Sequence, residues 1–412
     1  PTFNGMAANG SGVVFSASNA AKFGNSGGSV FTDSQTNFSD LLWWDASTGV
    51  QQLITHSSAS GNKSSAATTN AGFGGIAPNG EGVVFSSPDA TQFGQDGVAF
   101  SDTYSTSADL FWWDKAKGDQ WLITHNKTGG NNTSASVSGA VFVGIAKDSS
   151  GVVFSNINVS GYGNSGVGFT DAGTSTADLM WWDKALGEQK LITHSSLAGN
   201  GESVATTLSS FNAMANDSSG VVFNNVNATF FGNNGTAFVD GVVTGTDYFW
   251  WDKATGIQQL ITHSSIAGNT TSVASAGANY HATANDSAGV VFSHNNATQF
   301  GNNGMAFLDV ATSARDLFWW DKATGEQTLI NHSSAVGNNS SASLNGAGFY
   351  GMANDSTGVV FSNSNATELG NNGVAFTDAG TSAQDLFWWN KATGVQQLIT
   401  HSSAVGNTAS EA

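Results

Sequence analysis

The chain has 412 residues and a formal net charge of −18, with 12 Lys and Arg residues against 30 Asp and Glu residues. This acidic balance excludes a basic groove for nucleic acid and disfavours an anionic membrane surface as partner. Hydrophobic residues make up 39% and aromatic residues 11% of the chain, more than a disordered protein carries, so we expect it to fold.

The composition also bears on location. Cysteine is absent, so neither disulfides nor thiolate metal sites hold the fold together. No apolar run approaches the roughly 18 residues of a membrane-spanning helix, so we expect no membrane insertion. A surface poor in Lys and rich in Asn, Ser, Thr and Gly is more typical of secreted proteins than of cytosolic enzymes. We therefore predict an extracellular or cell-surface location.

One sequence unit recurs six times along the chain. Pairs of adjacent tryptophans follow one another at a step of 69 residues, at Trp43/Trp44, Trp112/Trp113, Trp181/Trp182, Trp250/Trp251, Trp319/Trp320 and Trp388/Trp389. A fixed period of this length indicates a repeat architecture. We predict a single domain over 1–412, with units at about 1–65, 66–134, 135–203, 204–272, 273–341 and 342–412.

Each unit contains four short apolar runs between turn signals. In chain order, "DLFWW" and "QTLIN" of the fifth unit are followed by "GFYGMA" and "GVVFS" of the sixth. The runs are too short for helices and rich in β-branched and aromatic residues, so they predict four strands. Neighbouring side chains of a strand point to opposite faces, so a Trp-Trp pair requires a sheet covered on both sides. The sequence therefore predicts an all-β, six-bladed β-propeller, each blade a four-stranded antiparallel sheet of about 69 residues.

The stretch "MANDSTGVVFSNSNATELG…DLFWWNKATGVQQLITH" resembles the TolB-type and WD-like β-propeller repeats, and the resemblance covers all six units. Asp355 matches the acidic residue of the turn between the first two strands, and Asp321 matches the Trp-Asp pair, which Asn390 replaces in the last unit. The resemblance implies a propeller fold but no particular activity. The two long connections of each unit are predicted to emerge on one side, where binding residues concentrate.

An Asp in the loop between the second and third strands is followed seven residues later by the Asp that opens the Trp strand. Carboxylates and free carbonyls on a Gly-rich loop are ligands that calcium prefers, so calcium is the candidate cofactor. The alternative is that these residues accept backbone N–H bonds in turns. The candidate metal ligands are Asp33, Asp40, Asp102, Asp109, Asp171, Asp178, Asp240, Asp247, Asp309, Asp316, Asp378 and Asp385.

Histidines recur with the same period, from His56 to His401, each after the outermost strand. Histidines of different blades are too far apart to share an ion, so we expect them to form structural hydrogen bonds to a neighbouring loop. Acids and histidines are spread evenly around the repeats, and no asymmetric catalytic set emerges. The sequence therefore predicts a protein that is not an enzyme, without catalytic or cofactor-binding residues beyond the calcium ligands.

Asn-X-Ser/Thr triplets recur at one loop position. They make the chain a candidate glycoprotein if the host glycosylates proteins, with acceptors at Asn158, Asn227, Asn296 and Asn365.

We predict an extracellular, self-associating scaffold of a surface, matrix or filament. One alternative is a carbohydrate-binding, lectin-like propeller that uses a loop aromatic such as Phe300. A propeller hydrolase is a further alternative. The expected partners are carbohydrate or further copies of the chain, with neither nucleic acid nor membrane insertion.

Overall fold

The structure is a computed structural model. It describes the chain except for residues 26–28, 34, 59–60, 67–69, 96, 104–105, 128–130, 136–137, 174–175, 198, 204–208, 242–244, 267, 273–277, 336, 342–345, 379–383, 404–406 and 411–412.

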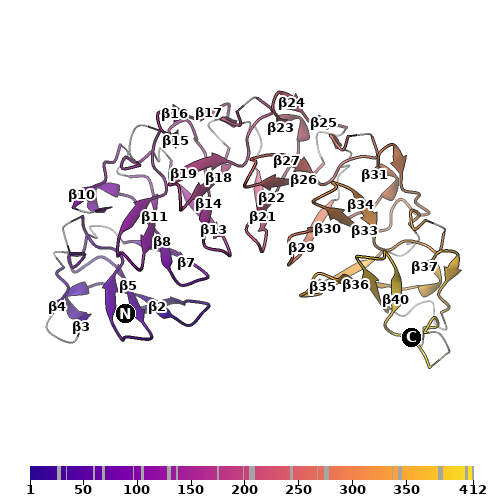
Figure 1. Cartoon of the computed structure of the whole chain (residues 1–412), viewed down its shortest axis with the longest axis horizontal. Helices are drawn as coiled ribbons and strands as arrows, with labels where there is room; N and C mark the ends of the chain where they lie inside the picture. Colours follow the sequence, from indigo (N-terminus) through magenta and orange to yellow (C-terminus); the bar gives the residue numbers. More distant parts are fainter. Residues whose placement is uncertain are drawn as a thin grey trace. The chain divides into compact units, whose positions relative to one another are not determined.

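The chain forms two compact units, Pro1–Ser209 and Ser210–Ala412. Within the described residues each unit contains three four-stranded antiparallel sheets, in which strands follow one another in chain order (Figure 1). We call these sheets blades, first to sixth in chain order. The predicted all-β propeller class is confirmed, and the only helical segments in the described part of the chain are short 3-10 turns. None of them is long and apolar enough to cross a bilayer.

The first three blades belong to the first unit. Their strands are β1 (Thr2–Met6), β2 (Gly12–Ala17), β5 (Asp40–Asp45) and β6 (Gln51–Leu53); β7 (Gly72–Ile76), β8 (Gly82–Ser87), β11 (Asp109–Asp114) and β12 (Gln120–Leu122); β13 (Val141–Ile145), β14 (Gly151–Asn156), β18 (Asp178–Asp183) and β19 (Glu188–Leu191).

The last three blades belong to the second unit. Their strands are β21 (Ser210–Met214), β22 (Gly220–Asn225), β26 (Asp247–Asp252) and β27 (Gln258–Leu260); β29 (Asn279–Thr283), β30 (Gly289–His294), β33 (Asp316–Asp321) and β34 (Gln327–Leu329); β35 (Gly348–Met352), β36 (Gly358–Asn363), β39 (Asp385–Asn390) and β40 (Gln396–Leu398).

The long loops carry small elements of their own. Antiparallel pairs join β3 (Gly24–Asn25) to β4 (Ser29–Val30), β9 (Gly94–Gln95) to β10 (Val98–Ala99), β15 (Gly163–Asn164) to β16 (Val167–Gly168), β23 (Gly232–Asn233) to β24 (Thr236–Ala237), β31 (Gly301–Asn302) to β32 (Met305–Ala306), and β37 (Gly370–Asn371) to β38 (Val374–Ala375). The 3-10 turns are η1 (Ala20–Lys22), η2 (Ala90–Gln92), η3 (Ala228–Phe230), η4 (Ala297–Gln299) and η5 (Ala366–Glu368).

The two long loops of one blade pair with each other. In the third blade β17 (Thr170–Asp171) lies parallel to β20 (Glu202–Ser203), and in the fourth β25 (Val239–Asp240) lies parallel to β28 (Thr271–Ser272). The first of each pair belongs to the loop between the second and third strands, and the second follows the fourth strand. The expectation that both long loops emerge on one side is therefore confirmed for these blades.

The tryptophan pairs pack between neighbouring blades. In the second unit Val222 pairs with Trp250 and Val221 with Trp251, so the two indoles leave opposite faces of the sheet. The ring of Trp250 lies 6.2 Å from that of Trp320 in the fifth blade, and both residues are 0% exposed. Pairs of the same kind join Trp43 to Trp113, Trp112 to Trp182, and Trp319 to Trp389.

The hairpin between the third and fourth strands is held by its own side chains. Gly325 has a φ of +70°, a conformation that favours glycine, and Oδ1 of Asp321 accepts the backbone N–H of Thr324 at 3.0 Å. In the sixth blade Oδ1 of Asn390 accepts the N–H of Thr393 at the same distance. Asn390 therefore preserves the turn although it departs from the Trp-Asp pattern.

A glycine opens the second strand of every blade because an indole occupies the space above it. A Cβ at Gly289 would lie 2.5 Å from Cζ2 of Trp319 and 2.0 Å from the carbonyl oxygen of Trp320, whereas a Cβ at Gly351 would meet nothing within 4 Å.

We therefore expect Gly289→Ala to destabilise the second unit by about 2–3 kcal/mol through overpacking. The matched variant Gly351→Ala lies in the same unit and is expected to change stability by less than about 1 kcal/mol. Urea unfolding followed by tryptophan fluorescence measures both. Equal stability of the two variants would refute the packing argument.

Candidate functional site

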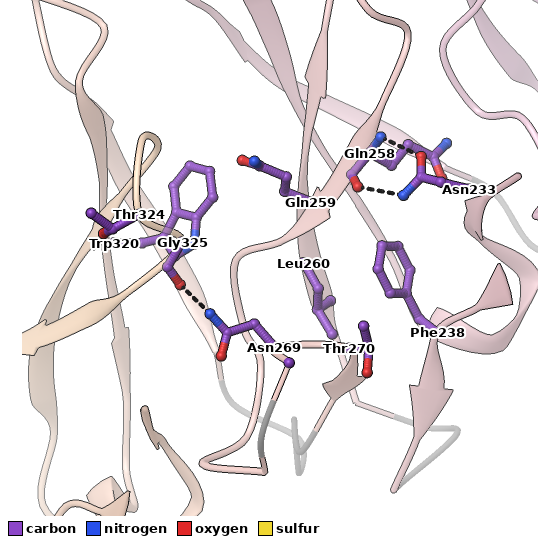
Figure 2. Close-up of a pocket in the computed structure, with 11 residues that line it drawn as sticks. Asn233, Phe238, Gln258, Gln259, Leu260, Asn269, Thr270, Trp320, Thr324 and Gly325 are labelled. Carbon is purple, nitrogen blue, oxygen red and sulfur yellow. Dashed lines mark hydrogen bonds between the residues drawn. The ribbon is translucent and has the colours of Figure 1, made fainter. Parts of the chain in front are cut away.

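A cavity of about 260 Å³ lies between the fourth and fifth blades, and we call it the seam pocket. The fourth blade supplies its edge strand β27 and residues of both long loops, and the fifth supplies Trp320 and the hairpin at Gly325 (Figure 2). Trp320, Phe238 and Leu260 form apolar walls, and Gln259 and Asn269 add amides. Every residue lining this pocket is uncharged.

The loop wall of the pocket is fixed by a pair of amides. Nδ2 of Asn233 donates to the carbonyl oxygen of Gln258 at 2.8 Å, and the N–H of Gln258 donates to Oδ1 of Asn233 at 2.8 Å (Figure 2). Oε1 of Gln258 also accepts the N–H of Gly232 at 3.1 Å. The loop strand β23 is thereby tied to the edge strand β27.

The opposite wall is held by contacts to one carbonyl group of the next blade. Nδ2 of Asn269 donates to the carbonyl oxygen of Gly325 at 2.8 Å, and Nε2 of His263 lies 2.8 Å from the same oxygen. Asn269 has a φ of +52°, which Asn tolerates better than most residues. Burial lowers the pKa of His263, so the ring is neutral at pH 7.

The expected structural hydrogen bond to a neighbouring loop is therefore confirmed for His56, His125, His263 and His332. His56 contacts the carbonyl oxygen of Gly118 at 2.6 Å, and His332 contacts that of Gly394 at 2.8 Å.

The second blade shows a similar seam with several substitutions, of which Trp121 is the largest side chain. Trp121 takes the position that Gln259 has in the fourth blade, and the cavity at its seam with the third blade is only about 80 Å³. Trp182 and Gly187 line it as Trp320 and Gly325 line the seam pocket. Gln95 and Asn132 also replace Asn233 and Thr270 there, and the indole of Trp121 adds the most volume among these replacements.

The predicted calcium ligands form carboxylate pairs with different surroundings. In the fifth blade Oδ2 of Asp309 accepts the N–H of Ala297 and Oδ1 accepts that of Ala311, both at 2.8 Å. The first bond starts the 3-10 turn η4, and Asp33, Asp102, Asp171, Asp240 and Asp378 hold the corresponding turn or loop in the same way. The turn-capping role is therefore present in the structure.

The second member of each pair is buried. Oδ1 of Asp109 accepts the hydroxyls of Thr124 at 2.7 Å and Ser134 at 2.6 Å, whereas its Oδ2 is buried without a hydrogen-bond partner. Burial raises the pKa of Asp109 to about 7, and the charge of Asp102 adds to the rise. An unpartnered Oδ2 recurs at Asp40, Asp178, Asp247, Asp316 and Asp385.

No group of three or more His, Asp or Glu side chains in the described part of the chain is arranged to hold a metal. A calcium site would therefore combine one carboxylate pair with hydroxyl and carbonyl oxygens, and calcium stays a prediction.

The predicted glycosylation acceptors cap turns. Oδ1 of Asn227 accepts the N–H of Thr229 at 3.0 Å, and Asn296 and Asn365 do the same at η4 and η5. Oδ1 of Asn158 accepts the N–H of Ser160 at 3.0 Å. These bonds use the amide oxygen, whereas a glycan is attached to the amide nitrogen; at Asn365 this nitrogen donates to Oε1 of Glu368 at 3.4 Å. Glycosylation stays a prediction.

The interpretation of Phe300 as a loop aromatic for sugar stacking is wrong. Phe300 is 0% exposed, and its ring lies 4.9 Å from that of Phe318. The 3-10 turn η4 directs it into the core of its own blade, so it cannot meet a ligand.

No protein-family model and no curated protein sequence matches the chain. Similar solved structures include the propeller domain of the Trilobed protease from Pyrococcus furiosus, which is 9% identical with a TM-score of 0.34, the match covering 97% of this chain and 85% of that one. TolB from Acinetobacter baumannii is 9% identical with a TM-score of 0.28 over 87% and 58% of the two chains. A prolyl endopeptidase structure is 12% identical with a TM-score of 0.33 over 87% and 46%.

The chain thus spans about half the length of the prolyl endopeptidase and of TolB that it matches. The resemblance to TolB-type propellers is confirmed for the fold, and identities this low show the fold alone.

The prediction that the chain is not an enzyme is corrected by these similarities. The similar structures include the propeller domain of a protease and a prolyl endopeptidase, so the comparisons do not bear out the expectation that the chain is not an enzyme. The prediction rested on the even spacing of acids and histidines. In the structure these residues serve each blade's own turns and seams, so their spacing does not bear on catalysis.

The seam contacts of several residues were not predicted from the sequence. Gln258 and Asn269 lie in segments repeated every 69 residues, and the repetition of "QQL" was an available signal. The departure of Trp121 from that pattern was visible as well. Their contacts to the next blade were not predictable, because no local pattern says which carbonyl group a side chain will meet.

Proposed function

We propose that this chain is an extracellular scaffold of a surface or matrix, built to present repeated binding pockets and loops. The main support is that successive blades within each unit are joined by the same kinds of contact. In the fourth and fifth blades these are the Trp250–Trp320 pair and the bonds of His263 and Asn269 to Gly325. A frame repeated in this way places equivalent loops at regular intervals, which suits multivalent binding.

The composition supports the extracellular part of the proposal. Only 12 of 412 residues are Lys or Arg, and the loops are rich in Asn, Ser, Thr and Gly. Self-association belongs to the same proposal, because equivalent surfaces repeated on one chain allow several copies to engage together.

Localisation in the source organism tests this function. An antibody against the chain is expected to label intact cells or the secreted matrix, and protease added to intact cells is expected to remove the label. A cytosolic enzyme probed in parallel controls for cell lysis. Labelling only after permeabilisation would contradict the proposal.

We also propose calcium as the ion that orders the carboxylate pairs. The support is that one buried oxygen of Asp109 lacks a partner, and that burial, with a smaller contribution from the charge of nearby Asp102, raises the pKa of Asp109. A divalent cation would compensate both charges.

Thermal unfolding in the presence of calcium is compared with thermal unfolding in the presence of the chelator EDTA. Calcium at about 100 times its Kd is expected to stabilise the fold by about 3 kcal/mol, and EDTA to remove that gain. The variant Asp102→Asn is expected to reduce the calcium effect. Identical melting temperatures in calcium and EDTA would contradict a calcium role.

A further inference from the structure

Three residues that line the seam pocket carry polar atoms that the protein leaves without partners. Oε1 of Gln259, Oδ1 of Asn269 and Nε1 of Trp320 are buried and make no hydrogen bond among the described residues. Two of these atoms are acceptors and the indole N–H is a donor. Buried polar groups without partners cost free energy, so a ligand that supplies both donors and acceptors gains from entering here.

The lining also limits what that ligand can be. It carries no charged side chain, which disfavours anions, cations and phosphate groups. Trp320, Phe238 and Leu260 provide apolar surface beside the amides of Gln259 and Asn269 (Figure 2). A ligand that matches this surface is neutral and has hydroxyl groups beside an apolar C–H face.

The size of the pocket also fits a small ligand of this kind. Its volume of about 260 Å³ lies just below the usual range of small-molecule sites, roughly 300–1,000 Å³. A pocket of this size suits a single sugar ring at the end or on a branch of a longer chain. From these three observations we propose that the seam pocket binds one residue of a neutral carbohydrate. This inference rests on the proposed role as an extracellular binding scaffold and names its ligand class.

The chain supplies its own comparison for this site. At the seam of the second and third blades Trp121 fills the space that Gln259 leaves open, and the cavity shrinks to about 80 Å³. Phe100, Leu122, Asn131, Trp182 and Gly187 repeat the lining of the seam pocket, so a similar frame exists in an open and a filled form. The fourth blade binds the sugar, and the second does not.

The indole N–H of Trp320 provides a local reporter, because hydrogen bonding to a ligand moves its proton resonance. The probes are methyl glycosides of glucose, galactose and mannose, and N-acetylglucosamine, each titrated into the whole chain and followed by ¹H–¹⁵N spectra. Trp320→Phe assigns the peak. At least one probe is expected to shift it with a Kd of roughly 1 mM.

Two reciprocal variants complete the test. Gln259→Trp copies the second blade and is expected to weaken the effect on Trp320 at least about tenfold, while its melting temperature shows that the fold persists. Trp121→Gln is expected to open the filled seam and to make the indole of Trp182 respond to the same sugar.

The inference is overturned if no probe shifts the Trp320 resonance at about 10 mM, or if the shift survives Gln259→Trp. Neither result would change the expected outcome of the localisation experiment. A failure of the sugar site is therefore distinguishable from a failure of the scaffold proposal.

Discussion

Replacing Trp112 with alanine is expected to destabilise the first unit by about 3–5 kcal/mol. Trp112 is 0% exposed, its ring lies 6.1 Å from that of Trp182 in the next blade, and Nζ of Lys184 lies 4.9 Å from its ring centroid. The substitution removes one side of the contact between the second and third blades and leaves a cavity. The loss is a large part of the stability that a domain usually has.

Trp44→Ala is the matched control for this experiment. Trp44 is the second indole of the first pair and is 37% exposed, so its truncation removes less buried area. Its expected cost is about 1–2 kcal/mol. Urea unfolding of both variants, followed by circular dichroism, measures the difference. If the two substitutions cost the same, packing between blades is not what makes the tryptophan pairs important.

In the metal-free protein, stability is expected to fall as the pH rises from about 4 to about 7, because of the buried aspartates. Burial raises the pKa of Asp109 to about 7, whereas the same group has a value near 3.8 in the unfolded chain. Between these two values the unfolded state has lost a proton that the folded state keeps, so raising the pH favours unfolding. The contribution of one such group is at most about 4 kcal/mol.

Asp109→Asn isolates this effect. The amide oxygen can still accept the hydroxyls of Thr124 and Ser134, but the side chain carries no charge. The variant is expected to be more stable than the natural protein at pH 8 by about 1–3 kcal/mol and to lose less stability between pH 5 and pH 8.

Asp148→Asn, at an exposed turn, serves as the control and is expected to keep the natural pH dependence. Urea unfolding at pH 5 and pH 8 gives the free energies. A natural protein and an Asp109→Asn variant with parallel pH profiles would show that Asp109 does not titrate in this range.

The predicted pH dependence can also test the calcium proposal. A bound divalent cation would stabilise the charged form of Asp109 and so lower its pKa. Calcium is therefore expected to flatten the pH dependence of the natural protein, but not that of Asp109→Asn. The comparison separates a carboxyl group kept neutral by burial from one that holds a metal.

The sequence alone determined the strands, the turns and the covering of both sheet faces. These follow from local rules: the period of 69 residues, the alternation of side chains along a strand, and two adjacent indoles such as Trp250 and Trp251 that cannot share one face. The side chain that starts a turn could also be foreseen, since Asp321 needs only its own neighbours to cap the hairpin.

Only the tertiary structure decided what each repeated residue meets across a seam. His263 and Asn269 converge on the carbonyl oxygen of Gly325, about one repeat further along the chain. Trp121 fills a cavity that Gln259 leaves open, and Phe300 turns into the core instead of toward solvent. The reason is physical: strand alternation is set by adjacent residues, whereas seam contacts and cavities depend on how two separately formed sheets pack together.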